Sequence, residues 1–428
     1  MNQMRDTGLA ALLERATDRI EPDQGSARRA LARATTVRRR RRLLGVAATA
    51  AAVAVIAVGV QVLPGPGGAG EPEPAGPRPG SSSPAAPTST APGSRPVVPE
   101  AVVGERWDPF TVVDAPRRGS LLPATIDPPA DPVSIGEAPL EAALLAWPEE
   151  GEDLRLLGND GAWRSVPGTA EAVSGTLRDV VSPRLTDDGR LVAMAVDDGV
   201  LVVDVTTGEQ EVLPWTGVLA EPQDLMPGLE WSPDGTELAV LHWKGVWFTD
   251  LDGDFERAGF DAAYGTGFSY DSDGSVLMRR WRAQALVRYR DGVEVGRAPY
   301  LVWGGTRAVA SDGRVAMAGG GSDLPGDGGP LVLDAATGQV IGYRPIRDRS
   351  SVYTDNGYLA PIGFADADTV VLAVGPMDFR SMDPGEETRH LITWDLDTDT
   401  FALLASGAPQ SEGMARAVFA VGAWEIAP

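Results

Sequence analysis

The sequence predicts an all-β fold, a six-bladed β-propeller, preceded by one transmembrane helix and a proline-rich linker. Two observations predict this organisation. From about residue 140 onward, a unit of about 40–50 residues with four short apolar strands and two tight turns recurs, and such a period is typical of propeller blades. Before these repeats lies an uncharged apolar segment that is long enough to cross a bilayer.

The apolar segment spans residues 43–63, and its only polar side chains are Thr49 and Gln61. As a helix it would cover roughly 30 Å, which is the thickness of the hydrocarbon layer. Five consecutive arginines, residues 38–42, precede it, whereas the residues directly after it carry no charge. The positive-inside rule therefore predicts a single-pass protein of the cell membrane, with residues 1–42 in the cytoplasm and the rest outside. A cleaved signal peptide is the alternative, but its charged region and apolar core would be shorter.

The flanks of this segment differ in composition. Residues 1–42 carry eleven arginines against five acidic residues, and apolar side chains recur at helical spacing between Leu9 and Ile20. We interpret this basic segment as a topogenic tail with a short helix; a docking helix for a partner is the alternative. Residues 64–99 contain eleven prolines among Gly, Ser, Ala and Thr, so they cannot bury a core and are predicted to be a disordered linker. Residues 100–428 are the predicted extracytoplasmic propeller.

Two kinds of turn punctuate the repeats. The first kind reads Thr186-Asp187-Asp188-Gly189, Ser232-Pro233-Asp234-Gly235, Asp271-Ser272-Asp273-Gly274 and Ala310-Ser311-Asp312-Gly313. The second kind reads Thr206-Thr207-Gly208, Asp252-Gly253-Asp254, Asp291-Gly292 and Ala336-Thr337-Gly338. Asp-Gly and Thr-Gly pairs supply the positive φ angles that tight hairpins need. Two less regular units, at residues 142–166 and 365–399, bring the predicted number of blades to six.

The first unit lacks an obvious inner strand, while residues 416–421 form a strand that no repeat at the C-terminus uses. We expect these residues to pair with residues 142–147 and close the ring, because closure removes free sheet edges. Residues 101–114 also have a strand-like composition, so a seven-bladed propeller is the alternative.

The segment Ser232-Pro233-Asp234-Gly235-Thr236-Glu237-Leu238-Ala239 resembles the signature turn and strand of TolB-like and WD40-like propeller repeats. With its basic tail and apolar segment, the chain resembles membrane-anchored WD40-like propeller proteins of actinobacteria. The likeness covers roughly residues 135–425. It implies a binding scaffold and transfers no catalytic residue.

Composition excludes several classes of chemistry. The chain has no cysteine, which excludes disulfides, thiolate metal sites and thiol catalysis, and its only histidines are His242 and His390. We expect both histidines to be ordinary strand residues. Outside residues 1–42 the net charge is −29, so the large domain should repel phosphate backbones and bind no nucleic acid. There is also no Gly-x-Ser-x-Gly elbow and no phosphate-binding loop.

Aromatic side chains are the candidate binding residues. All eleven tryptophans lie beyond residue 106, and we expect most of them to pack between blades. Trp215, Trp243 and Trp303 lie near predicted strand ends and are the candidates for the mouth of the central funnel. Calcium is the metal alternative, because carboxylates alternate over residues 250–254 and 395–399. Turn chemistry explains the same residues, so no metal and no cofactor is predicted.

These observations favour a protein- or ligand-binding module that acts without catalysis. Its expected partner is an extracytoplasmic protein, peptide or glycan, and it could sense or scaffold at the cell envelope. The alternative is an enzyme of the lactonase or lyase kind. Such an enzyme would need three or more carboxylates converging in the channel.

Overall fold

The structure, a computed structural model, describes residues 98–149, 151–173, 182–220, 227–260, 267–280, 284–299, 308–319, 328–347, 359–375, 388–407 and 417–424. All of these belong to one unit of the chain, Gly93–Pro428. The predicted cytoplasmic segment (1–42), the transmembrane helix (43–63) and nearly all of the linker (64–99) lie outside the described residues. Among the residues that the structure does describe, no helix has both the length and the hydropathy of a membrane span.

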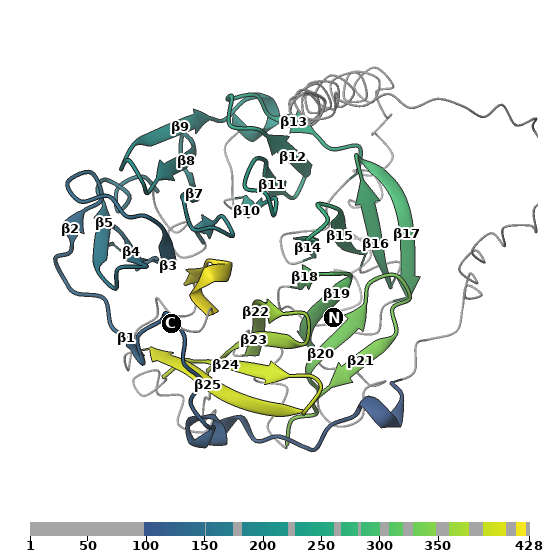
Figure 1. Ribbon diagram of the computed structural model, residues 1–428. Helices are drawn as coiled ribbons and strands as arrows, with labels where there is room; N and C mark the ends of the chain where they lie inside the picture. The colour runs from purple at the N-terminus through teal and green to yellow at the C-terminus, as the bar shows by residue number, and fades with distance from the viewer. Residues whose placement is uncertain are drawn as a thin grey trace, which may run out of the picture. The chain divides into compact units, whose positions relative to one another are not determined.

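The strands of the described residues form six sheets, arranged as the blades of a propeller around a central channel (Figure 1). Each blade has an antiparallel core of four strands, so the prediction of an all-β, six-bladed propeller is confirmed. From the channel outward, blade 1 contains β26 (Val418–Phe419), β3 (Ala143–Trp147), β4 (Leu154–Gly158), β5 (Trp163–Val166) and β2 (Val133–Ser134). Blade 2 contains β6 (Arg184–Leu185), β7 (Leu191–Val196), β8 (Gly199–Asp204) and β9 (Gln210–Pro214).

The other four blades follow in chain order. Blade 3 contains β10 (Gly228–Trp231), β11 (Leu238–His242), β12 (Gly245–Thr249) and β13 (Glu256–Arg257). Blade 4 contains β14 (Phe268–Tyr270), β15 (Val276–Arg280), β16 (Ala285–Arg290) and β17 (Val293–Pro299). Blade 5 contains β18 (Val309–Ser311), β19 (Arg314–Gly319), β20 (Gly329–Asp334) and β21 (Val340–Tyr343). Blade 6 contains β22 (Leu359–Asp366), β23 (Thr369–Val374), β24 (His390–Asp395), β25 (Thr400–Gly407) and β1 (Thr125–Ile126).

The C-terminal strand closes the ring, as the sequence predicts. In blade 1, β26 is antiparallel to β3, with Val418 opposite Ala146 and Phe419 opposite Leu145. The chain then enters a short 3-10 helix, η7 (Val421–Trp424), which lies at the channel. Its Trp424 is buried between blades 1 and 6.

The segment before blade 1 forms a belt on the outside of three blades, and we use the name belt for residues 98–134. It contains two 3-10 helices, η1 (Glu100–Val102) and η2 (Pro109–Asp114), and makes parallel contacts with the outermost strands of blades 5, 6 and 1 in turn. The belt therefore spans the junction between blades 6 and 1, where the ring closes (Figure 1). The seven-bladed alternative is wrong: residues 101–114 hold helical turns and single bridges, with no sheet of their own.

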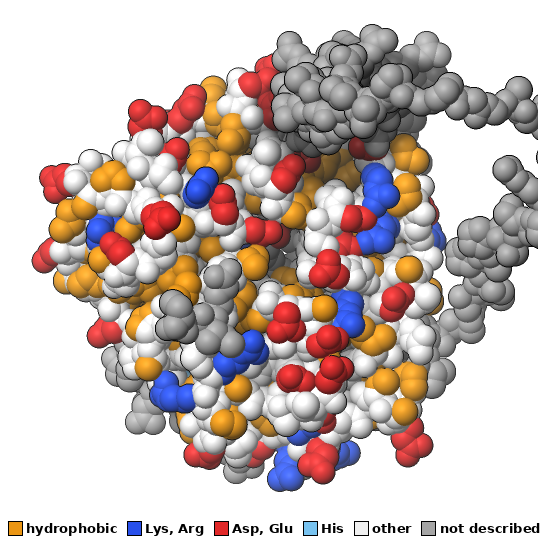
Figure 2. Space-filling view, viewed as in Figure 1, with side chains coloured by type: hydrophobic (Ala, Val, Ile, Leu, Met, Phe, Trp, Pro, Cys, Tyr) orange, Lys and Arg blue, Asp and Glu red, His pale blue; other side chains and the backbone are white. Residues whose placement is uncertain are grey.

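The core is divided among the blade interfaces. Buried apolar side chains of the described residues form six clusters, one between each pair of neighbouring blades. Large aromatic rings fill this wedge-shaped space, as predicted for the tryptophans: Trp147 and Trp424 lie between blades 6 and 1, and Trp394 lies between blades 5 and 6. Acidic side chains are instead spread over the viewed surface, with basic ones scattered among them (Figure 2).

The predicted Asp-Gly turns join the innermost strand of a blade to the next strand. In the turn of blade 2 the first residue stabilises the loop from inside: the Thr186 hydroxyl accepts hydrogen bonds from the backbone N–H groups of Arg190 and Leu191, both at 3.1 Å. The third residue fixes the other side, since Asp188 accepts the Thr186 hydroxyl at 2.7 Å. Gly189 closes the turn at φ +70°, where an added Cβ would overlap the backbone of Ala143. The second residue of the turn is left to face the channel.

Candidate functional site

A cavity of about 220 Å³ occupies the central channel. Its walls come from the inner strands of blades 2 to 6 and from the C-terminal segment that closes blade 1. The second residues of the first four Asp-Gly turns all line it: Asp187, Pro233, Ser272 and Ser311. One repeated structural position therefore supplies a ring of different side chains to a single space, so that each turn sets the chemistry of one sector of the wall.

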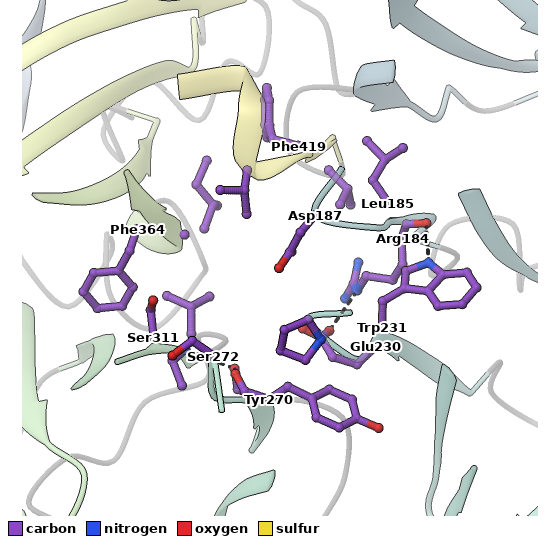
Figure 3. Close-up of a pocket in the computed structure, with 18 of the residues that line it drawn as sticks. Arg184, Leu185, Asp187, Glu230, Trp231, Tyr270, Ser272, Ser311, Phe364 and Phe419 are labelled. Carbon is purple, nitrogen blue, oxygen red and sulfur yellow. Dashed lines mark hydrogen bonds and ion pairs between the residues drawn. The ribbon is translucent and has the colours of Figure 1, made fainter. Parts of the chain in front are cut away.

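Asp187 is the distinctive member of this ring. Its carboxylate points into the open space, with Phe364 and Ser311 across from it (Figure 3). The side chain is exposed to solvent within the channel, yet the walls surround it. This burial, together with the negative charges of Glu230 and Asp188, raises the pKa of Asp187 from its ordinary 3.8 to about 6. Within the described part of the chain, no donor or cation pairs with this carboxylate.

The other charged groups on the wall neutralise each other. Arg184 of β6 reaches across to blade 3, where its Nε lies 3.2 Å from a carboxylate oxygen of Glu230 and 2.9 Å from the carbonyl oxygen of Leu229. The Trp231 indole N–H donates to the Arg184 carbonyl oxygen at 3.1 Å, which fixes the same contact from the other side (Figure 3). With Arg184 and Glu230 compensated, the described wall carries one uncompensated negative charge, that of Asp187.

Much of the remaining wall is apolar or aromatic. Aromatic side chains come from five elements, and they are Trp231, Tyr270, Phe364, Phe419 and Trp424. The Tyr270 hydroxyl does not serve the cavity, because it donates to Glu237 at 2.9 Å. A charged group bound here would therefore meet one carboxylate, a few serine hydroxyls and several apolar and aromatic side chains.

Of the three tryptophans predicted for the funnel mouth, the two that the structure describes do not line the cavity. Trp215 follows β9, on the outside of blade 2; it stacks at a tilt against Phe255 and donates its indole N–H to the Val196 carbonyl oxygen at 3.0 Å. Trp243 is 57% exposed in the hairpin between β11 and β12, with the Lys244 ammonium 5.0 Å from its ring centroid. Trp303 lies outside the described residues.

Two of the carboxylates considered for metal binding serve the turns in which they lie. Among the described residues there is no group of three His, Asp or Glu side chains that could hold a metal ion. Asp252 accepts the backbone N–H of Asp254 at 3.1 Å, and Asp395 accepts both the backbone N–H and the hydroxyl of Thr398 at 2.8 Å, which is turn chemistry. The histidines are strand residues, as predicted. His242 lies in β11, and His390 lies in β24, where burial lowers its pKa.

The channel-facing residues were not predicted, although the sequence contains a signal for them. When the first four turns are aligned, the first position is polar or small, the third is always aspartate and the fourth is always glycine. The second position is not fixed either, and holds Asp, Pro or Ser. A position that the turn itself does not constrain is available for function, and here it is the one that faces the cavity.

The raised pKa of Asp187 predicts a specific pH dependence of stability. Between about pH 4 and 6 the unfolded chain loses this proton first, so the folded state binds more protons and its stability falls as the pH rises. Replacing Asp187 by Asn should remove this contribution. The free energy of unfolding of the variant minus that of the original chain should therefore rise between about pH 4 and 6 and stay constant above about pH 6. Urea unfolding at several pH values measures this. Asp198→Asn, at an exposed turn of the same blade, is the control; equal slopes for both variants would contradict the assignment.

The fold and the cavity together define a β-propeller with a central pocket. No protein-family model matches the sequence, and a search of curated proteins finds no significant relative. Solved propeller structures are similar at a distance. TolB from Acinetobacter baumannii is 17% identical with a TM-score of 0.39, and the match covers 62% of this chain and 66% of that one, just under two thirds of its length. A putative TolB from Agrobacterium tumefaciens is 16% identical with a TM-score of 0.36, covering 53% of this chain and 80% of that one. A gluconolactonase from Xanthomonas campestris is 15% identical with a TM-score of 0.35, and the match covers 60% of this chain and 95% of that one.

Proposed function

We propose that the chain is a membrane-anchored binding module and that its propeller recognises an extracytoplasmic partner at the central cavity. The observation that carries this proposal is the cavity itself, a single space lined from five blades and from the closing segment, with one unpaired carboxylate directed into it. Small pockets with apolar walls and a few convergent polar groups are typical ligand sites. The partner is a protein, peptide or glycan, and nucleic acid is disfavoured by the acidic surface.

The membrane anchor rests on the sequence. Residues 43–63 are the proposed span, with the N-terminus in the cytoplasm and the propeller outside. Protease added to intact spheroplasts should then digest residues 100–428 and leave the basic tail protected. A propeller that resists digestion until the membrane is lysed would place it on the other side.

A variant that fills the cavity tests the binding role. Ser311 lies at the end of β18 with its side chain in the cavity, so Ser311→Trp should occupy the space that a ligand needs. Val212→Trp is the matched control, because Val212 is 46% exposed on β9, away from the cavity. With the full chain as bait after crosslinking in cells, Ser311→Trp should reduce capture of bound partners at least about tenfold, a loss of about 1.4 kcal/mol. Equal capture by both variants would refute the cavity as the binding surface.

One observation favours the enzyme as a second candidate. A carboxyl group with a pKa of about 6 is suited to general acid–base catalysis near neutral pH. The enzyme hypothesis is weaker than the binding proposal because the described wall has no second free carboxylate, since Glu230 is paired with Arg184. Turnover of a lactone, glycan or peptide by the purified chain, abolished in Asp187→Asn, would replace the binding proposal with this one.

A further inference from the structure

The charge balance of the cavity identifies the chemistry of its ligand. An unpaired carboxylate surrounded by protein is unfavourable, because the walls replace part of its hydration without supplying a counter-charge. The side chains of the Arg184–Glu230 pair, only 17% and 13% exposed respectively, already satisfy each other. Asp187 therefore remains the one charged side chain of the described wall without a counter-charge. A bound cation would stabilise its carboxylate more than any other kind of ligand.

The size of the cavity limits what that cation can be. At about 220 Å³ the space is smaller than the roughly 300–1,000 Å³ of pockets that enclose whole drug-sized ligands. It suits one side chain or one chain terminus of a larger molecule whose remainder stays outside.

The donors on the wall distinguish an organic cation from a metal ion. Calcium takes six to eight oxygen ligands and magnesium demands a near-ideal octahedron. Apart from Glu230, which is paired with Arg184, the described wall offers the Asp187 carboxylate and three serine hydroxyls. Ser269 already donates to the Tyr270 carbonyl oxygen at 3.1 Å and Ser272 to Asp312 at 2.6 Å, which leaves Ser311. Aromatic side chains on the remaining wall, among them Phe364 and Phe419, favour ammonium and guanidinium groups, which are attracted to aromatic rings.

We propose that the central cavity binds an ammonium or guanidinium group presented by the partner, and that Asp187 is the counter-ion that holds it. This inference rests on the proposed binding function and specifies the ligand class. The cation comes from a lysine or arginine side chain or from a free N-terminus of a polypeptide. The Arg184–Glu230 pair shapes the adjacent wall without contributing net charge.

Protonation of Asp187 should compete with this ligand. The charged groups that face it are Asp188 in its own turn, Glu230 from β10 and Arg184 from β6. Because its pKa lies at about 6, the carboxylate is fully charged only above that value, so binding of a cation should strengthen as the pH rises through 6. Added salt should weaken binding at every pH.

Small probes can test the assignment on the full-length chain. Nα-acetyl-lysine methylamide and Nα-acetyl-arginine methylamide present the side-chain cations, Ala-Gly amide presents a terminal ammonium, and Nα-acetyl-norleucine methylamide is the neutral control. Ligand-observed NMR titrations at pH 7.5 and low salt would give their dissociation constants. At least one cationic probe should bind at least tenfold more tightly than the neutral compound. The cationic probe with the lowest dissociation constant then shows whether the charge comes from lysine, arginine or a chain terminus.

Variants assign the binding to Asp187. Asp187→Asn should lose at least tenfold in affinity for the best cation and lose the rise through pH 6, whereas Asp187→Glu, which keeps the charge, should retain part of the binding. Asp198→Asn makes the same charge change on the same blade, away from the cavity, and should bind normally. Undiminished binding by Asp187→Asn, or equal affinity of cationic and neutral probes, would overturn the inference. If the inference about the cation is overturned, reduced capture by Ser311→Trp would still support the cavity as the binding surface. The proposed function and the proposed ligand class can therefore be refuted independently.

Discussion

Truncation after Gly413 should remove most of the stability of the propeller. The deletion takes away β26 and η7, so β3 becomes an unpaired edge at the channel and the hydrogen bond from the Ala420 N–H to the Leu144 carbonyl oxygen is lost. It also removes Trp424, which is 3% exposed between blades 1 and 6. Loss of a buried tryptophan alone costs about 3–5 kcal/mol, and a whole domain is stable by only about 5–15 kcal/mol.

Thermal unfolding of the truncated chain checks this expectation. The midpoint should fall by about 10 °C or more, or no cooperative transition should remain. Truncation after Trp424 is the matched control, because it keeps every contact described for β26 and η7. If the two truncated chains melt at the same temperature as the original, ring closure does not depend on the C-terminal strand.

Trp107→Ala should be the most damaging single substitution in the belt. The indole is 6% exposed and stacks on Phe401 with ring centroids 4.3 Å apart, so it joins the belt to the outer part of blade 6. Its backbone is held separately, since the Trp107 N–H donates to the Pro345 carbonyl oxygen at 2.8 Å. We therefore expect the belt to stay attached while the free energy of unfolding falls by about 3–5 kcal/mol.

Chemical denaturation measures the loss, with Val113→Ala as the control. Val113 belongs to the same belt but is 54% exposed, so its truncation should change the free energy by less than about 0.5 kcal/mol. Comparable effects of the two substitutions would mean that the belt contributes little through its buried contacts.

The blades were predictable because each one carries local signals. Turns such as Ser232–Gly235 have fixed chemistry, and strands such as β23 (Thr369–Val374) are continuous apolar runs; both were found at the residues where the structure has them. Ring closure was also predictable, because residues 416–421 had the pattern of a strand that no repeat used and the first repeat lacked an inner strand. The belt was not predictable in this way. Its parallel contacts with blades 5, 6 and 1 depend on residues far along the chain, and its helical turns have no regular apolar period.

The site was harder to predict than the fold. Tryptophan was the obvious candidate by size, yet Trp215 packs outside the channel because a large apolar ring is stabilised most by burial between blades. The residue that faces the cavity, Asp187, looks like any other aspartate in a turn. Only the three-dimensional arrangement separates it from Asp188 beside it, whose carboxylate is used by the turn itself.

The belt also constrains the order in which the protein can fold during synthesis. Val103 and Trp107 leave the ribosome before any blade exists, but their partners, Tyr343 and Ile346, belong to blade 5, and the partners of β1 belong to blade 6. The contacts of the belt with blades 5 and 6, like the strand β26 itself, must therefore wait for the last third of the chain. Contacts between distant parts of a sequence form slowly, so the nascent domain should pass through a long interval with its outer strands uncovered and its ring open. Under the proposed topology this delay would have a use, since it would keep the propeller from closing before the chain has crossed the membrane.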